Sequence, residues 1–310
     1  MVDPDIRRLL DTVFNVADPD AAPDVAQLRA AAEQSPILLG GTPESVESVA
    51  DMSVPGASSS IGVRVYRPRA DGALSLMLYT HGGGWVTGSL ESHDRLCRLL
   101  ANRLSAVIVA VDYRCAPEHI YPAALDDTYE AWLWACAHAH RLGAEGKRFA
   151  VAGDSSGGNL AAALTLRLRA RNLAQPRLQL LLYPALDASC SRGAYREFVT
   201  GFNLSAAQMA WYWSAYQGST CVDAPQLSPL ASSDLSALAP ALIAVAECDV
   251  LRDDGLTYAH RLHEAGVTVR VIRCEGMIHG FLRWTGAVPT ALRLVQKIAN
   301  EAKQMLAEPP

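Results

Sequence analysis

Residues 149–157 read Phe-Ala-Val-Ala-Gly-Asp-Ser-Ser-Gly, which places the pattern G-x-S-x-G directly after a short apolar run. The run is typical of a buried strand, and the residues after the pattern predict a helix. A sharp turn between strand and helix lifts the central serine hydroxyl out of the backbone, and the flanking glycines remove side chains that would clash there. The stretch therefore predicts an α/β fold with Ser155 as a nucleophile, since Ser156 does not lie at the centre of the pattern.

A second glycine-rich stretch lies upstream of the serine. Residues 81–85 read His-Gly-Gly-Gly-Trp and follow the apolar run at 74–79. A serine nucleophile needs donors directed at the oxyanion that forms on attack, and backbone amides are fixed in place before the reaction begins. Consecutive glycines let such a loop approach a substrate closely. A flexible glycine turn is the alternative, whereas the spacing matches neither common phosphate-binding motif.

An acid and a histidine follow Ser155 in an informative order. Asp249 comes directly after the apolar run at 241–248, and His279 follows the run at 267–274. Both runs predict strands, and open α/β sheets place their chemistry just beyond the carboxyl ends of such strands. The order serine, acid, histidine is that of the α/β-hydrolases and not of chymotrypsin or subtilisin. We predict that Asp249 orients His279, which serves as general base and then general acid.

Two further carboxylates compete with Asp249 for the role of orienting acid. Asp253 and Asp254 open the helix predicted over 254–265. Carboxylates at that position cap free N–H groups and oppose the helix dipole. This ordinary role accounts for both, so Asp249 is the preferred acid.

Composition limits the classes of function. The chain has 310 residues, of which 50% are hydrophobic and 19% charged, with a formal net charge of −5. This length suits one large α/β domain or two ordinary ones. There is no basic patch for nucleic acid or an anionic membrane, and no apolar stretch approaches the roughly 18 residues that span a bilayer. Residues 1–8 lack the apolar segment of a secretory signal, so a soluble cytoplasmic protein is expected.

The cysteines do not form a recognisable pattern. There are seven, an odd number, and no C-x-x-C is present. In a chain of this size such scatter predicts reduced thiols rather than a disulfide framework or a zinc site.

Strands alternate with helices along most of the chain, which predicts a mostly parallel sheet covered on both faces. The expected strands lie at 62–68, 74–80, 106–112, 148–153, 178–183, 241–248 and 267–274. The expected helices lie at 3–15, 22–34, 91–104, 123–141, 157–171, 205–217, 254–265 and 287–306.

Residues 186–239 interrupt this alternation and contain no convincing strand. The segment carries six aromatic residues, namely Phe198, Phe202, Trp211, Tyr212, Trp213 and Tyr216. Long insertions between sheet elements are usually functional. We predict that this insertion and residues 1–45 together form a helical cap over the site, leaving 46–185 and 240–310 as the two parts of the core. Ordinary packing of the aromatics against the core is the alternative.

Several motifs in the same order resemble those of the hormone-sensitive-lipase-like branch of the α/β-hydrolases, which includes many bacterial carboxylesterases. The similarity runs from about residue 62 to the C-terminus. It rests on the segments 81–85, 112–119, 153–158, 227–230, 249–255 and 276–281. The resemblance implies an α/β-hydrolase core with a helical cap, no cofactor or metal, and hydrolysis of short- to medium-chain acyl esters.

The resemblance also implies roles for residues around the nucleophile. The amides of Gly83, Gly84 and Ser156 are expected to form the oxyanion hole, and Glu118 to brace the site from behind. Ser156 stands where alanine is common in the family. Only its backbone N–H is required, so the oxyanion hole should persist.

The substrate pocket is less clearly indicated. Aromatic residues are more often core than pocket, but Trp85, Tyr183 and the aromatic residues of the insertion are candidate walls, with Phe202 and Trp211 preferred among the latter. The expected partner is a small acyl ester, and a homodimer is an expectation from similar proteins alone. Two other functions stay open: an amidase or lactonase with the same triad, and a small-ligand receptor of the same fold. The presence of serine, acid and histidine together argues against the receptor.

Overall fold

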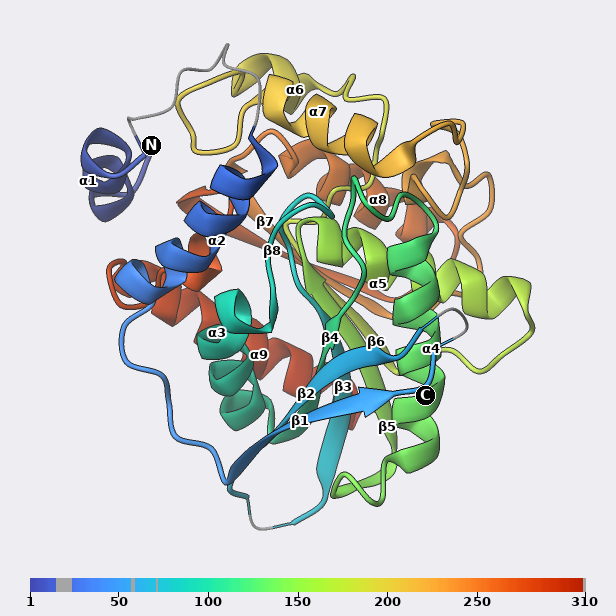
Figure 1. The fold of residues 1–310 in the computed structure, drawn as a ribbon. Coiled ribbons are helices and arrows are strands. Elements are labelled where there is room, and N and C mark those ends of the chain that lie inside the picture. The colour runs from blue at the N-terminus through green and yellow to red at the C-terminus, as the bar shows by residue number, and fades with distance from the viewer. Residues whose placement is uncertain (15–23, 57–58, 71, 309–310) are drawn as a thin grey trace.

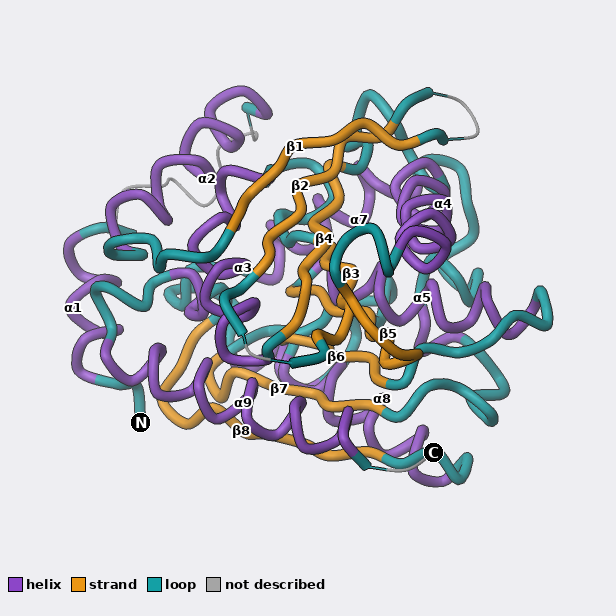
Figure 2. The backbone as a smooth tube through the Cα atoms, turned by 90° about the horizontal axis from the view of Figure 1, so that it is seen from below, coloured by secondary structure: helices purple, strands orange, loops and turns teal. Residues whose placement is uncertain are grey.

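A sheet of eight strands runs through the centre of a computed structural model that describes residues 1–14, 24–56, 59–70 and 72–308 (Figure 1). Figure 2 shows the strands fanning from β1 at one edge to β8 at the other in the order β1-β2-β4-β3-β5-β6-β7-β8. Strand β2 is antiparallel to both neighbours, and all other pairs are parallel. The predicted mostly parallel α/β sheet is therefore confirmed. The strands are β1 (Ser48–Val54), β2 (Ile61–Arg67), β3 (Leu74–Thr80), β4 (Ala106–Asp112), β5 (Ala144–Asp154), β6 (Leu178–Leu182), β7 (Ala241–Cys248) and β8 (Val269–Ile278).

Helices cover both faces of this sheet. In Figure 1, α3 and α9 lie on one side, and α4, α5 and α8 lie on the other. The helices are α1 (Pro4–Thr12), α2 (Val25–Leu39), α3 (Leu90–Leu104), α4 (Ala123–His138), α5 (Ser156–Ala170), α6 (Gly193–Glu197), α7 (Ala206–Gln217), α8 (Arg252–Glu264) and α9 (Pro289–Ala307). In the part of the chain that the structure describes, no helix combines the length and apolar character needed to cross a bilayer.

The core strands are apolar because both of their faces are covered. Every residue of β3 is buried, and so are the first six residues of β4, Ala-Val-Ile-Val-Ala-Val. Continuous apolar runs of this kind are typical of parallel strands between two helical layers. Burying each Val, Leu or Ile side chain contributes about 1.5–3 kcal/mol, so the centre of the sheet provides a rigid base for the loops at its edge.

Several elements differ from the sequence-based expectation. Helix α2 ends at Leu39 rather than at residue 34, and β5 begins at Ala144 rather than at residue 148. Strand β1 was not expected, because six of its seven residues are exposed and its sequence, Ser-Val-Ala-Asp-Met-Ser-Val, presents no apolar face; it forms by pairing with β2 at the sheet edge. The short helix α6 was also not expected. Strand β8 continues to Ile278, four residues past the expected end, because Ile278 pairs with Cys248 after an irregularity in the register.

Two parts of the chain far apart in sequence lie on the same side of the molecule. In Figure 1, α6 and α7 from residues 186–239 lie at the top, and α2 from the N-terminal segment runs down the left side from just below them. Helix α7 begins at Ala206 with Ser205 as its N-cap, as expected, and Ser205 and Gln208 form a reciprocal capping box. Helix α1 is held elsewhere, at the sheet edge, where the amide of Asp3 donates to the carbonyl of Gly276 at 3.0 Å.

Candidate active site

Ser155 occupies the turn between β5 and α5. Its backbone has φ 56° and ψ −120°, a conformation that a residue with a side chain adopts only under constraint. The constraint comes from close packing: a Cβ atom at Gly157 would overlap the carbonyl of Thr80, and one at Gly153 would overlap the carbonyl of Gly157. The amide of Ser155 also donates to the carbonyl of Leu182 at 2.8 Å. The turn therefore holds the serine hydroxyl above the end of the sheet.

The structure brings Ser155, His279 and Asp249 together. Each is the first residue after a strand, following β5, β8 and β7 respectively. Nε2 of His279 lies 2.8 Å from Oγ of Ser155, and Nδ1 of His279 lies 2.7 Å from Oδ2 of Asp249. Asp249 is 1% exposed, and its other oxygen accepts from the amide of Leu251 at 2.9 Å. A buried carboxylate on Nδ1 fixes the tautomer that leaves Nε2 able to accept the serine proton.

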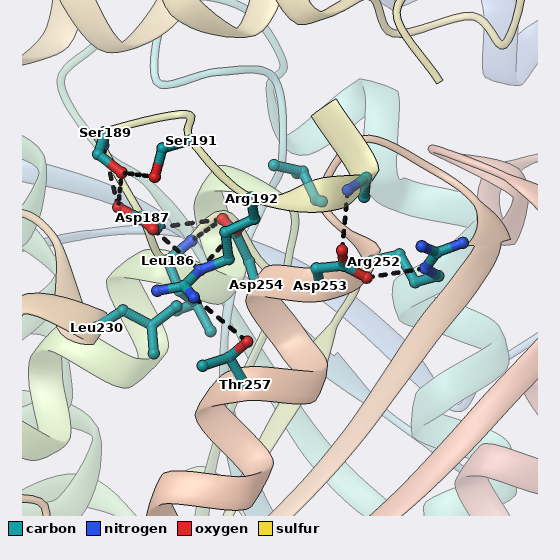
Figure 3. A network of polar contacts seen from close by, with 12 residues as sticks. Leu186, Asp187, Ser189, Ser191, Arg192, Leu230, Arg252, Asp253, Asp254 and Thr257 are labelled. Atoms are coloured by element: carbon teal, nitrogen blue, oxygen red, sulfur yellow. Dashed lines mark hydrogen bonds and ion pairs between the residues drawn. The ribbon is translucent and has the colours of Figure 1, made fainter. Parts of the chain in front are cut away.

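The two competing carboxylates have another function. Asp253 and Asp254 lie in the first turn of α8, but neither caps that helix, so the expectation that they cap it is wrong. Figure 3 shows them directed at the segment after β6. Oδ2 of Asp253 accepts from the amide of Ala194 at 2.8 Å, and Oδ2 of Asp254 accepts from the amides of Leu186 at 3.0 Å and Asp187 at 3.1 Å. Burial raises the pKa of Asp254 well above its ordinary value.

Ion pairs strengthen this connection between α8 and the segment 186–197. In Figure 3, Arg192 reaches back to Asp187, with 2.9 Å between Nε and Oδ2. Arg252 bonds to Glu197 at the end of α6, with 2.7 Å between Nη2 and Oε2. The start of the insertion is thus fastened to the helix that follows Asp249.

The glycine loop after β3 requires its glycines. Gly83 and Gly84 have φ values of 127° and 62°, which favour glycine. A Cβ atom at Gly83 would overlap the carbonyl of Thr87, and one at Gly84 would overlap the ring of Tyr212 from α7. Both glycines line the cavity that contains Ser155. Ser156 is the first residue of α5, where a helical N–H has no partner within the helix.

A cavity of about 420 Å³ lies over these groups. Helix α2 forms one wall with Leu28, Ala31 and Leu38, and α7 forms another with Met209 and Tyr212. The volume is within the range of about 300–1,000 Å³ that is typical of small-molecule sites. Because the walls come from α2 and α7, the two segments expected to form the cap shape the space above Ser155.

Known proteins with this arrangement identify the family. A family model described as alpha/beta hydrolase fold matches residues 77–283. The chain belongs to the α/β-hydrolase family. Ethyl acetate hydrolase from Pseudomonas putida is 41% identical over 266 residues, covering 84% of this chain and 83% of that protein. Carboxylic ester hydrolase LipN from Mycobacterium tuberculosis is 40% identical over 294 residues, covering 91% and 77%.

Solved structures agree with the family assignment. The esterase of Pyrobaculum calidifontis in its monoclinic form has a TM-score of 0.91 and 38% identity, and the match covers 99% of this chain and 100% of that one. These similarities confirm the carboxylesterase branch that the sequence motifs indicated, so this α/β-hydrolase is an ester-hydrolysing enzyme by family.

Of the aromatic residues expected to line the pocket of this α/β-hydrolase, Tyr212 of the insertion lines the cavity, but the four preferred candidates do not. Among the described residues, Trp85, Tyr183, Phe202 and Trp211 lie outside the cavity lining. Trp85 is fully buried and stacks on Tyr216 with 4.3 Å between ring centroids. Tyr183 packs edge-on against the ring of His279, with 5.0 Å between ring centroids. Phe202 packs on Phe198 at 5.1 Å and Trp211 on Tyr212 at 5.1 Å. The aromatic walls are Phe14, Tyr212 and Trp284.

Asp154, the residue before Ser155, is a functional candidate that sequence reasoning missed. Its Oδ1 accepts from the hydroxyl of Tyr79 at 2.7 Å and from the amide of Gly82 at 2.9 Å, and it lies 3.2 Å from Nε2 of His93. Burial by itself would raise the pKa of this carboxyl, but His93 and the hydrogen bond from Tyr79 hold it below its ordinary value. The charged carboxylate thereby ties the glycine loop to the strand that carries Ser155. The only signal in the sequence was its place inside G-x-S-x-G.

His81 shapes the same loop as a neutral side chain. It is buried and stacks on Tyr113 with 4.2 Å between ring centroids. Its Nδ1 lies 2.9 Å from the carbonyl of Gly82. Burial lowers the pKa of His81 to about 3, so the ring is uncharged near neutral pH.

Proposed function

We propose that this protein hydrolyses short- to medium-chain acyl esters with Ser155 as nucleophile, His279 as general base and acid, and Asp249 as the orienting acid. The observation that carries the proposal is the unbroken chain of two hydrogen bonds, 2.8 Å and 2.7 Å long, from the serine through the histidine to a buried carboxylate. Nucleophile, base and orienting group within hydrogen-bond reach are the signature of covalent acyl transfer.

The reaction follows from this geometry in two halves. Oγ of Ser155 attacks the acyl carbon while Nε2 of His279 takes the hydroxyl proton. The tetrahedral intermediate collapses as the same nitrogen gives that proton to the departing alcohol, which leaves an acyl-enzyme. Water then enters, loses a proton to His279 and releases the carboxylic acid, restoring Ser155. Asp249 stays ionised and stabilises the imidazolium in both halves.

The developing oxyanion would be bound by the amides of Gly83, Gly84 and Ser156. Two of these come from the loop after β3 and one from the first residue of α5, so they approach the acyl oxygen from two sides. Such donors are oriented before the reaction, and the loss of one typically costs about 2.7–4 kcal/mol in the transition state.

The cap and the cavity favour small esters. We propose that residues 1–45 and 186–239 act together as the cap, because α2 and α7 supply most of the apolar lining. The modest cavity and the relative named ethyl acetate hydrolase both support short acyl and alcohol groups over long lipids.

A series of p-nitrophenyl esters from acetyl to palmitoyl tests the proposal. Wild-type protein should be most active on short or medium acyl chains, and Ser155→Ala should abolish the activity while its circular dichroism stays unchanged. Folded wild-type protein that hydrolyses none of the series would refute the proposal and favour a ligand receptor. Parallel assays of p-nitroanilides and lactones of matched acyl length separate an esterase from an amidase or a lactonase.

A further inference from the structure

A cationic side chain lies in the wall of the cavity next to the histidine. Arg283 ends the short 3-10 helix Phe281–Arg283, which follows β8 and His279. It lines the same cavity as Ser155 and His279. Its guanidinium is close to the residue after the histidine, because a Cβ atom at Gly280 would lie 3.3 Å from Nη2 of Arg283. The positive charge is therefore beside the reacting groups.

The guanidinium of Arg283 has no partner among the described residues. It makes no hydrogen bond and no ion pair within 4.0 Å there, and its Nε is buried without an acceptor. Two other partly buried arginines are paired: Arg114 bonds to Asp127 at 2.8 Å and Arg167 to Asp126 at 2.6 Å. A partly buried charge without a partner is costly, and such groups are usually paired. The donors of Arg283 are thus available to a bound molecule.

The nearby carboxylate of Asp154 does not bind the N–H donors of Arg283. Asp154 also lines the cavity, but its carboxylate already accepts from Tyr79 and Gly82 and contacts His93. Arg283 acts on Asp154 through space and contributes to lowering the pKa of that carboxyl, without reaching it as an ion pair. The guanidinium keeps its hydrogen-bonding capacity.

Three other polar residues in the cavity wall are engaged within the protein. Oγ of Ser35 accepts from Nε1 of Trp284 at 3.3 Å, and Nδ2 of Asn203 donates to the carbonyl of His279 at 3.2 Å. Oε1 of Gln208 accepts from the amide of Ser205 at 2.9 Å. Arg283 differs from these groups in carrying charge and in having no bond to the described part of the protein.

We propose that Arg283 forms an anion subsite in the cavity and that the preferred substrates are esters carrying a carboxylate in their acyl or alcohol part. The inference rests on the proposed ester hydrolysis by Ser155. A guanidinium offers a planar fork of donors that matches a carboxylate. Hydrolysis of such an ester yields a dicarboxylic acid when the anion is in the acyl part, and a hydroxy acid when it is in the alcohol.

Pairs of esters that differ in charge test the subsite in two arms. Mono-p-nitrophenyl adipate is compared with p-nitrophenyl hexanoate for an anion in the acyl part. Likewise, 4-acetoxybenzoate is compared with 4-acetoxybenzamide for an anion in the alcohol part. The measured quantity is the ratio of kcat/KM for the anionic ester to kcat/KM for its neutral partner. Arg283→Gln removes the charge, Arg283→Lys keeps it without the fork, and Arg273→Gln, an exposed arginine on β8, is the matched control.

In at least one arm, the ratio should fall about 10- to 100-fold in Arg283→Gln, the range expected for losing a hydrogen bond to a charged group. Arg283→Lys should recover part of the loss, and Arg273→Gln should match the wild type. A ratio unchanged in both arms, while the neutral esters are still hydrolysed, overturns the subsite.

Two further outcomes distinguish a failure of the anion subsite from a failure of the proposed esterase function. Wild-type protein that discriminates more than tenfold against the anionic ester in both arms also overturns the subsite, and this needs no variant to fold. Folded wild-type protein that hydrolyses none of the four esters would contradict the proposed esterase function rather than the subsite.

Discussion

Replacing Asp154 by asparagine should weaken both the fold and catalysis, although the side chain keeps its shape. The carboxylate joins Gly82 of the glycine loop and Tyr79 of β3 to the residue before Ser155, with bonds of 2.9 and 2.7 Å, and contacts His93 at 3.2 Å. An amide oxygen still accepts from Gly82 and Tyr79, but without charge. Each bond then loses about 1 kcal/mol and the contact with His93 is lost, so the free energy of unfolding should fall by about 2–3 kcal/mol.

The catalytic effect of Asp154→Asn follows from its bond to Gly82. That residue precedes the two glycines assigned to the oxyanion hole, and full loss of one such donor lowers kcat about 100- to 1,000-fold. A displaced loop should cost part of this, so kcat for p-nitrophenyl butyrate should fall about 10- to 100-fold with KM little changed. Unchanged kcat together with unchanged stability at pH 7 would refute the role of the carboxylate.

The pH dependence of stability gives an independent check on the charge of Asp154. Its pKa lies below the ordinary value in the folded protein, so its ionised form stabilises the fold. That contribution is fully present above the unfolded pKa of about 3.9 and is lost as the pH falls toward the folded pKa. Urea unfolding of wild type and Asp154→Asn should therefore differ most at pH 5–7 and converge below about pH 4.

Asp254→Asn is the matched control with the opposite sign. Burial raises the pKa of Asp254, so its ionised form destabilises the fold at neutral pH. The asparagine oxygen can keep the bonds from the amides of Leu186 and Asp187. The variant should be as stable as the wild type or more so at pH 7, with the difference disappearing in acid. Equal losses of stability in both variants would show that the sign of the pKa shift is irrelevant here.

Three other substitutions probe the site. Asp249→Asn should lower kcat about 10,000-fold, because an amide favours the wrong tautomer of His279. Kinetics with p-nitrophenyl butyrate measure the loss, and circular dichroism checks that the variant folds. A loss of kcat below tenfold would contradict the role of Asp249. Gly84→Ala should abolish activity, because its Cβ would overlap the ring of Tyr212 at a positive φ; recovery in the double variant with Tyr212→Ala would assign the loss to that overlap. Arg29→Gln should raise KM more than it lowers kcat, because Arg29 fastens α2 to the carbonyls of Val86 and Ala116. Steady-state kinetics measure both constants, and an unchanged KM would contradict this role of Arg29.

Part of the fold could be predicted because its signals are local. The apolar runs of β3 and β4 predicted strands that are buried on both faces, and Ser205 predicted the start of α7 as its N-cap. Strand β1 could not be predicted, because its exposed sequence forms a strand only through pairing with β2. The end of β8 could not be predicted either, because an irregular register opposite β7 extends this strand to Ile278, the residue before His279.

The sequence by itself determined the nature of the chemistry. Ser155, Asp249 and His279 each follow a strand in the order of the α/β-hydrolases, and the consecutive glycines at 83 and 84 lie in the loop after β3. Tertiary structure alone decided what surrounds them. Ser35 and Trp284 meet across 249 residues of sequence, and Asp154 and Gly82 across 72. Such contacts depend on how helices pack over the sheet, so no sequence pattern predicts the cavity walls, nor that Arg283 has no partner among the residues that the structure describes.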